Sequence, residues 1–448
     1  MKLSLDDIRG CLDGAIPSTM ATCAADGTPN VAFLSQVEYV DAEHVALSFQ
    51  FFNKTRANVL ANPHAQSLLV DPRTGSSFRL TLRYLRTETS GPLFERMKAK
   101  LAGIASHTGM SGVFHLRGSD VYRVLEVECT HCSTLPPPPP RGNRLPALRT
   151  IAQKLTACAD LEELFERALS SLGESLGIEH AMLLVLDAVG GKLYTVASRG
   201  YTASGIGSEI ALGEGVVGVA ARERTPIRIG HMTIEYGYGR AIRSSAEHAG
   251  LSELIETEIP LPGLPESRSQ LAVPIVAGAR LLGVLYVEST RDSRFDYDDE
   301  DALATVAAQL GSAMLHLQDA PEPAVGAQAP AARLQASGAP VEVRHYAEND
   351  SVFLGEDYLI KGVAGAIFWA LVRDYADGKR NEFSNRELRV DPRIRLPDVS
   401  DNLEARLILL ERRLNERDAC VKIEKTGRGR FRLCVHRPLK LVEIPAPR

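Results

Sequence analysis

The sequence lacks several features that mark particular classes of protein. No apolar run approaches the roughly 18–20 residues that a membrane-spanning helix needs. Residues 1–10 alternate charged and apolar side chains and do not form a signal peptide. The 448 residues include only 7 cysteines, an odd number without the density of a secreted disulfide scaffold. We therefore expect a cytoplasmic protein with reduced cysteines and no membrane partner.

Catalytic signatures are also scarce. No phosphate-binding loop, paired-carboxylate motif or nucleophile–base–acid set stands out. The spacing of Gly213, Gly215 and Gly218 fits a dinucleotide fingerprint, but no parallel strand–helix–strand unit surrounds it. The net charge of −5 excludes a whole-protein attraction to nucleic acid, so any DNA-binding surface must be local. We expect a regulator in preference to an enzyme, and the enzyme alternative stays open.

Two stretches of biased composition divide the chain. Residues 133–146 contain an unbroken proline run, Pro136 to Pro140, which forms a stiff spacer. Residues 319–340 are mostly Ala, Pro, Gly and Gln, with too few large apolar side chains to pack a core. The sequence therefore predicts a multidomain α+β protein with two linkers. The three expected domains are residues 1–132, 147–318 and 341–448.

Residues 1–132 carry short strands and one motif at the start of a helix. Two strands flank the turn at Asp26-Gly27, and residues 54–63 read Lys-Thr-Arg-x-Asn-Val-Leu-x-Asn-Pro. This order of elements resembles the pyridoxamine-phosphate-oxidase-like split β-barrels that bind FMN. Because a helix N-terminus attracts anions, the resemblance implies that this helix start binds the flavin phosphate. The residues it implies are Lys54, Thr55 and Arg56 for the phosphate, with Ser48 and Gln50 near the ring.

The second strand, Val31 to Gln36, departs from that family because it contains no basic residue. A barrel that has lost its flavin and serves dimerisation or ligand sensing is therefore the alternative. Binding of heme or a deazaflavin, as in some relatives, also stays open.

Cys129 and Cys132 form one Cys-x-x-Cys motif at the end of this domain. Such a motif is half of a zinc or iron–sulfur site. Two copies of the chain across a dimer axis would complete a four-cysteine metal site. The alternative is a pair of ordinary thiols before the linker.

Residues 147–318 carry four motifs in a fixed order: Gly-Glu-Gly-x-x-Gly-x-Ala from 213, Ala-Val-Pro-Ile from 272, Leu-Leu-Gly-Val-Leu-Tyr-Val-Glu from 281, and Phe-Asp-x-Asp-Asp from 295. This order resembles a GAF domain, an α/β sandwich that binds small ligands or pairs through its flanking helices.

The segment from 230 to 264 is long for a loop in a compact domain, and we expect it to cover the sensor pocket. Its expected pocket residues are His231, Tyr236, Tyr238, Arg240 and His248. A solvated helix with surface histidines is the alternative, and heme held by His231 or His248 is another. The only cysteine nearby, Cys158, precedes this region, which disfavours a thioether-linked bilin.

Residues 341–448 end in an apolar helix followed by a basic hairpin. Leu403, Leu407, Leu410 and Leu414 recur at helical spacing, and the hairpin turn has glycines on both sides of Arg428. The order of strands, helices and hairpin resembles the winged helix of response regulators, which implies DNA binding. The implied DNA-contact residues are Arg406, Arg412 and Arg413 on the helix and Lys425, Arg428 and Arg430 on the hairpin.

The helix also carries Glu404 and Glu411, and the segment has only 21 basic against 18 acidic residues, a net charge of 21 − 18 = +3. A protein-binding winged helix, with its arginines paired to nearby acids, is therefore the alternative. Taken together, the three segments predict a homodimeric transcriptional regulator that responds to a small molecule or to redox state. An FMN-dependent oxidoreductase with regulatory extensions and a signalling scaffold without DNA binding stay open.

Overall fold

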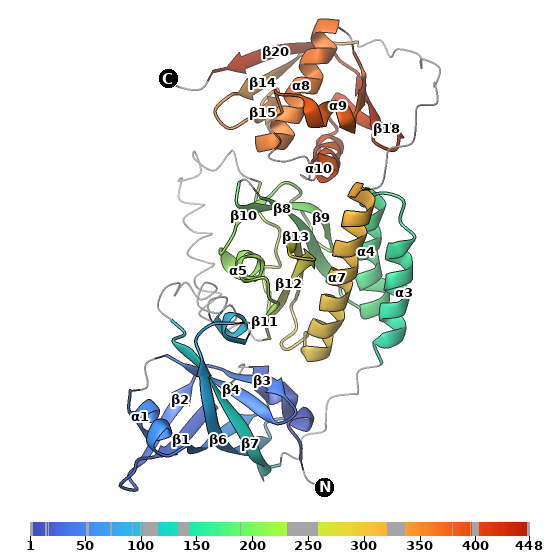
Figure 1. Ribbon diagram of the computed structural model, residues 1–448. Coiled ribbons are helices and arrows are strands. Elements are labelled where there is room, and N and C mark those ends of the chain that lie inside the picture. The colour runs from blue at the N-terminus through green and yellow to red at the C-terminus, as the bar shows by residue number, and fades with distance from the viewer. Residues whose placement is uncertain are drawn as a thin grey trace.

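The computed structural model describes residues 3–13, 16, 18–50, 53–71, 74–91, 93–98, 101, 115–132, 143–188, 190–230, 259–319, 337–378, 380–394, 396 and 403–445. The protein is a multidomain α/β protein. Its sheets fall into three units along the chain, and the central unit lies between the other two (Figure 1). We call them the N-terminal, central and C-terminal units. None of the described helices is long and apolar enough to cross a membrane.

The N-terminal unit is a seven-stranded antiparallel sheet in the order β2-β1-β5-β6-β7-β4-β3. Its apolar core lies under the 3₁₀ helix η1, where Leu5, Ile8 and Leu12 pack against sheet residues such as Leu80 and Tyr122. The elements are η1 (Asp6–Asp13), β1 (Ser18–Cys23), β2 (Pro29–Leu34), β3 (Val37–Asp41), β4 (His44–Phe49), α1 (Asn53–Ala61), β5 (His64–Val70), β6 (Ser77–Glu88) and β7 (Gly118–His131).

The central unit is a six-stranded antiparallel sheet in the order β10-β9-β8-β13-β12-β11. Helices α3, α4 and α7 lie together beside the sheet, and α5 lies apart from them (Figure 1). The elements are α3 (Leu145–Thr156), α4 (Leu161–Leu176), β8 (His180–Asp187), β9 (Lys192–Arg199), β10 (Glu209–Ala211), α5 (Gly215–Glu223), β11 (Ile227–Ile229), β12 (Ser269–Ala277), β13 (Arg280–Ser289) and α7 (Tyr297–Asp319).

Helix α4 has the terminal signals that a well-defined helix needs. The Asp160 side chain accepts a hydrogen bond from the backbone N–H of Glu163 at 2.9 Å, which caps the N-terminus. Gly177, with φ of 62°, ends the helix in the left-handed conformation. The acidic first turn of α4 is thereby held in a fixed place at one edge of the central unit.

The C-terminal unit has two small sheets, β16-β15-β14-β20 and β17-β19-β18, packed around three helices. The expected helix and basic hairpin are present as α10, β18 and β19. The elements are β14 (Val341–Tyr346), β15 (Ser351–Leu354), β16 (Asp357–Ile360), α8 (Gly362–Gly378), β17 (Glu382–Ser384), α9 (Asn385–Val390), α10 (Leu403–Glu416), β18 (Val421–Gly427), β19 (Arg430–Val435) and β20 (Leu439–Ile444).

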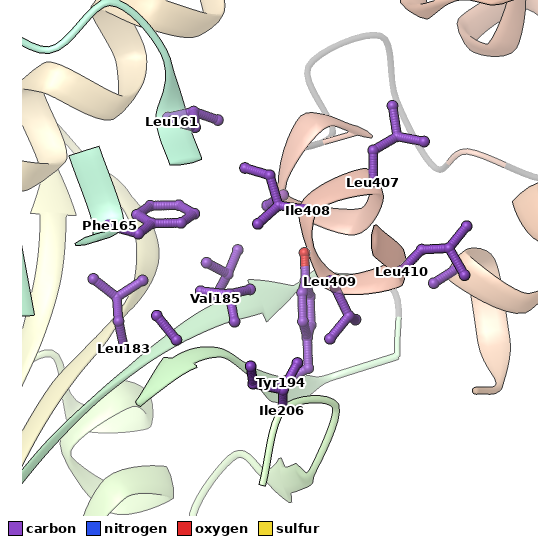
Figure 2. Packing of buried hydrophobic residues seen from close by; sticks show 14 of the residues in the cluster. Leu161, Phe165, Leu183, Val185, Tyr194, Ile206, Leu407, Ile408, Leu409 and Leu410 are labelled. Carbon is purple, nitrogen blue, oxygen red and sulfur yellow. The ribbon is translucent and has the colours of Figure 1, made fainter. Parts of the chain in front are cut away.

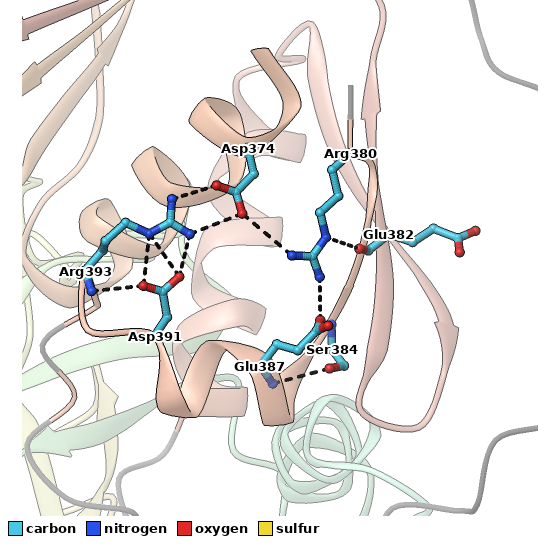
Figure 3. Close-up of polar contacts among 7 residues, drawn as sticks. All are labelled: Asp374, Arg380, Glu382, Ser384, Glu387, Asp391 and Arg393. Carbon is cyan, nitrogen blue, oxygen red and sulfur yellow. Dashed lines mark hydrogen bonds and ion pairs between the residues drawn. The ribbon is translucent and has the colours of Figure 1, made fainter. Parts of the chain in front are cut away.

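A polar network fixes the short helix α9 against α8 (Figure 3). Ser384 and Glu387 form a capping box at its start. After α9, the guanidinium of Arg393 donates to both Asp374, at 2.6 Å, and Asp391, at 2.6 Å. These contacts set where the chain leaves α9 on its way to α10.

Both expected linkers lie mainly outside the described residues. The first was predicted to extend to residue 146, but α3 already begins at Leu145. Its Pro146 stands in the first turn of α3, where a proline is tolerated because that N–H has no partner within the helix. In the second linker, residues 337–340 are described and lead directly into β14.

Candidate functional site

Helix α10 is buried on two sides. Leu407 and Leu410, on the face predicted to be apolar, point into the C-terminal unit, and Ile408 and Leu409 point the other way, toward the central unit (Figure 2). There they meet side chains from α4, β8 and β9 and the turn that follows β9, which include Leu161, Phe165, Val185, Tyr194 and Ile206. The central and C-terminal units therefore share one continuous apolar core.

Two of the three helix arginines predicted to contact DNA pair with residues across this contact. Arg406 is 4% exposed, and its Nη2 lies 3.2 Å from Oδ1 of Asp187 at the end of β8. Arg412 lies 2.5 Å from Glu166 of α4 and donates to the carbonyl of Val196 at 2.8 Å. The side chains of Arg406 and Arg412 are thus both paired with residues of the central unit.

Arg413 turns back into its own unit. It donates through Nε to the carbonyl of Leu359 at 3.1 Å and pairs with Glu416 at 3.2 Å. Burial lowers the pKa of the Arg413 guanidinium, since the charged form loses hydration. None of the three arginines is arranged as a free phosphate contact.

The hairpin residues predicted to contact DNA have different partners. Lys425 pairs with Asp160 at 3.2 Å and also with Glu162, both at the start of α4. Burial disfavours the charge of Lys425, but the hydrogen bond and charge of Glu162, joined by Asp160, raise the pKa of its ammonium group. Arg428 donates to the carbonyl of Leu317 at 3.2 Å, near the end of α7.

Arg430 is the exception among the predicted contacts. Its side chain is exposed, and it has no polar partner among the described residues.

The acids that hold these cations were missed by sequence reasoning. Arginines paired to nearby acids were anticipated only as an alternative, and the acids lie more than 200 positions earlier in the chain. A signal was present, because Glu162 and Glu166 are four residues apart and so share one face of α4. Nothing in the sequence indicated that this face meets α10.

A glycine turn is wedged between α10 and the segment that precedes β12. A methyl group at Gly207 would lie 2.7 Å from Cδ1 of Ile259 and 3.6 Å from Cδ1 of Leu409. One at Gly205 would lie 2.0 Å from Cδ of Pro262. Both glycines have positive φ, 59° and 89° in chain order, so the turn needs glycine for its backbone as well as for its space.

Residues 158–315 match the family described as GAF domain, over the sheet, helices α4 and α5, most of α7 and the acids just described. Residues 158–315 are a GAF domain. A GAF domain implies a role in sensing or signalling. No curated protein matches the chain.

Several solved structures are similar to parts of the chain. The GAF domain of an Acinetobacter phosphoenolpyruvate-protein phosphotransferase has 21% identity and a TM-score of 0.31, and the match covers 39% of this chain and 95% of that one. Free methionine-R-sulfoxide reductase of Neisseria meningitidis has 20% identity and a TM-score of 0.31, covering 40% and 95%. An FMN-binding protein of Syntrophomonas wolfei has 17% identity and a TM-score of 0.23, covering 28% and 88%.

The predicted pocket residues of the GAF domain lie outside the described residues. This applies to His231, Tyr236, Tyr238, Arg240 and His248, and to the heme alternative that depended on the two histidines. Their role stays a prediction. The described residues on either side of this segment are Gly230, which follows β11, and Ile259, which contacts the glycine turn.

The predicted flavin site lies at the start of α1, and most of its side chains are engaged internally. Ser48 accepts from the backbone N–H of Gln36 at 3.2 Å, and Thr55 accepts from Asn30 at 2.9 Å. Arg56 pairs with Asp120 at 2.5 Å. The cavity that these residues share has a volume of about 10 Å³, which is room for one water at most.

Two residues of this set are not engaged by internal hydrogen bonds in this way. The Gln50 side chain is 1% exposed, and neither its amide oxygen nor its amide nitrogen has a described partner. Lys54 is exposed in the first turn of α1. A buried amide without partners is costly, so Gln50 is the observation here that favours a bound group.

Cys129 and Cys132 are joined in a disulfide, with their Cα atoms 6.0 Å apart. The expectation that all cysteines are reduced is therefore wrong for this pair. The chain bends at the end of β7, because a continuing strand would hold the Cα atoms of Cys129 and Cys132 about 10 Å apart and they lie 6.0 Å apart. While bonded, the sulfurs are not metal ligands, and the described residues contain no group of three or more metal-binding side chains.

Proposed function

We propose that the protein is a ligand- or redox-responsive transcriptional regulator. In this proposal residues 1–132 are a split barrel, residues 147–318 contain the GAF sensor, and residues 341–448 are a winged helix that binds DNA. The observation that carries the proposal is the continuous core between the GAF domain and α10. A sensing domain is in direct contact with the helix and hairpin that are predicted to bind DNA.

The arrangement of the C-terminal unit supports this assignment. Helices α8 and α9 precede α10, and the hairpin β18–β19 follows it, which is the order expected of a winged helix with α10 as recognition helix and the hairpin as wing. Arg430 on the wing is exposed and free to meet a phosphate. A homodimer would present two wings to half-sites about one helical turn, roughly 34–36 Å, apart.

Selection of duplexes from a random pool by the full chain at low salt tests the proposal. The selected duplex should bind with an affinity that falls as salt rises, because phosphate contacts release counterions. Arg430→Ala should weaken binding and reduce the salt slope by about 1. The matched control is Arg83→Ala, which removes another exposed arginine, from β6. A pool without enrichment at any salt concentration, both for the full chain and for the same chain with Glu166→Gln and Asp187→Asn, contradicts DNA binding and leaves the signalling scaffold.

A second candidate function is an FMN-dependent oxidoreductase, and Gln50 is the observation that favours it. Lys54 at the N-terminus of α1 would hold the phosphate, and the Gln50 amide would meet the ring. The flavin would supply electron transfer. Ser48, Thr55 and Arg56 do not fit equally well, since they are bonded internally around a cavity too small for a ring system.

An absorption spectrum of the purified protein, before and after addition of FMN, decides this candidate. A flavin band that is lost in Gln50→Ala, and is retained in the control Gln66→Ala on the exposed face of β5, supports it. A protein that takes up no FMN leaves the barrel as a dimerisation or ligand-sensing module.

A further inference from the structure

We propose that the GAF domain inhibits DNA binding by occupying the same surface of the C-terminal unit that DNA would occupy. The inference rests on the proposed winged helix. It adds a partner for that surface: the acidic edge of the GAF domain, formed by Asp160, Glu162 and Glu166 of the α4 region and Asp187 of β8. The conformation described here is then the form that does not bind DNA.

The charges of the contact support this exclusion. DNA presents phosphates to the arginines and lysines of a winged helix. Here carboxylates take those positions: Asp187 on Arg406, Glu166 on Arg412, and Asp160 with Glu162 on Lys425. Each of these cations must leave its carboxylate before it meets a phosphate.

The apolar part of the contact makes the exclusion steric as well. Ile408 and Leu409 lie between the arginines along α10, and they are 3% and 5% exposed against the GAF domain. A recognition helix enters the major groove with one side open to the bases. Helix α10 has no such open side, since its other face packs in its own unit. Docking on the GAF domain and entry into DNA are mutually exclusive.

The glycine turn at 205–207 connects this contact with the rest of the sensor. A Cβ added at Gly207 would lie within 4 Å of Ile259, Leu409 and Arg413, and one added at Gly205 would lie 2.0 Å from Pro262. Displacement of residues 259–262 by an effector would therefore act on the glycine turn that lies next to α10. The effector changes DNA affinity only to the extent that it favours one arrangement over the other.

A pair of charge-neutralising substitutions tests the inference in the full chain. Glu166→Gln with Asp187→Asn removes two carboxylates from the contact and leaves every predicted DNA-contact residue intact. We expect the affinity for the selected duplex to rise at least tenfold and backbone amides of α10 to exchange hydrogen faster. The matched control is Glu174→Gln with Asp298→Asn, which makes the same change in net charge at positions of the GAF domain away from α10.

The outcomes separate this inference from the proposed function. If neither the native chain nor the released variant binds any duplex, the proposed DNA binding is wrong. If both bind with equal affinity, or if the control gains as much as the test variant, DNA binding stands and the inhibition is wrong. Should the double variant fail to fold, Val185→Ala loosens the same contact from the GAF side without a change in charge or in α10, and it must also raise DNA affinity for the inference to hold.

Discussion

The GAF domain meets its two neighbours in different ways. Toward the C-terminal unit it contributes to one apolar core that extends from Ile151 to Val435. Toward the N-terminal unit, which has a core of its own, the contact is polar and aromatic. There the Tyr297 hydroxyl donates to the carbonyl of Leu12 at 3.2 Å, and the guanidinium of Arg9 lies 4.3 Å from the Tyr297 ring. We infer that the GAF domain and the C-terminal unit fold as one body, to which the N-terminal unit is attached.

This difference bears on how signals travel. Burial of apolar area supplies most of the stability of a contact, whereas exposed ion pairs such as Arg9–Asp301, at 3.6 Å, contribute little. A change in the GAF domain is therefore coupled strongly to α10 and weakly to the N-terminal sheet. A signal from the N-terminal unit would pass through Tyr297 and its neighbours or through Glu95, which interacts with Arg222 and Glu223 of α5.

The largest effect is expected from truncation within the shared core. Leu409→Ala leaves a cavity between α10 and the GAF domain and should lower the free energy of unfolding by about 2–5 kcal/mol. In calorimetry the unfolding temperatures of the GAF domain and the C-terminal unit should fall together, while that of the N-terminal unit stays the same. Leu69→Ala is the converse control, because this fully buried side chain belongs to the N-terminal core. If Leu409→Ala lowers the unfolding temperature of the C-terminal unit alone, the GAF domain and the C-terminal unit do not fold as one body.

A smaller effect is expected from the buried ion pair across the same contact. A double-mutant cycle with Arg406→Ala and Asp187→Asn should give a coupling free energy of about 1–3 kcal/mol, because Arg406 is almost wholly buried. Urea unfolding of the four proteins measures it. The exposed pair Arg79–Glu128 of the N-terminal unit serves as the reference and should give well under 1 kcal/mol. Equal coupling in the two cycles would show that Arg406 is not desolvated by the GAF domain.

The sequence anticipated α10 and its hairpin but not what covers them. The leucines at helical spacing predicted one buried face, and the arginines between them suggested a solvated one. Ile408 and Leu409 stand among those arginines and were the indication of a second buried face. Their partners could not be found from the sequence, because Phe165 and Tyr194 are ordinary core residues of a separate domain. The Cys-x-x-Cys motif, in contrast, depends only on residues that are close in the sequence. The free thiols that the sequence suggested and the disulfide in the structure differ only in the oxidation state of Cys129 and Cys132.

At the N-terminal contact a modest effect is expected. Tyr297→Phe removes the hydroxyl that donates to Leu12 and should cost about 1 kcal/mol in the attachment of the N-terminal unit. Limited proteolysis between residues 115 and 145 and small-angle scattering would detect the looser attachment. DNA affinity and the stability of the GAF domain with α10 should stay unchanged. The control Tyr346→Phe removes a hydroxyl from β14 of the C-terminal unit. A large loss of stability in Tyr297→Phe would place the N-terminal unit within the shared body.

The smallest effect is expected from Glu411, a half-buried acid of α10, and its sign depends on pH. Burial, reinforced by Glu162, raises the pKa of Glu411 despite Lys425 and Arg412. A carboxyl with a raised pKa in the folded state stabilises the contact most below the ordinary glutamate pKa, and that contribution is lost as pH rises through the raised value. Asp160 has the opposite trend: burial opposes ionisation, but the Glu163 N–H and the charge of Lys425 lower its pKa. Its contribution is present above the ordinary aspartate pKa and is lost as pH falls through the lowered value.

Glu411→Gln should therefore stabilise the native chain at neutral pH by less than about 1 kcal/mol and flatten the decline of stability above the ordinary glutamate pKa. Thermal unfolding across pH 4 to 8 measures this change, and an unaltered profile would mean that Glu411 keeps its hydration beside the GAF domain.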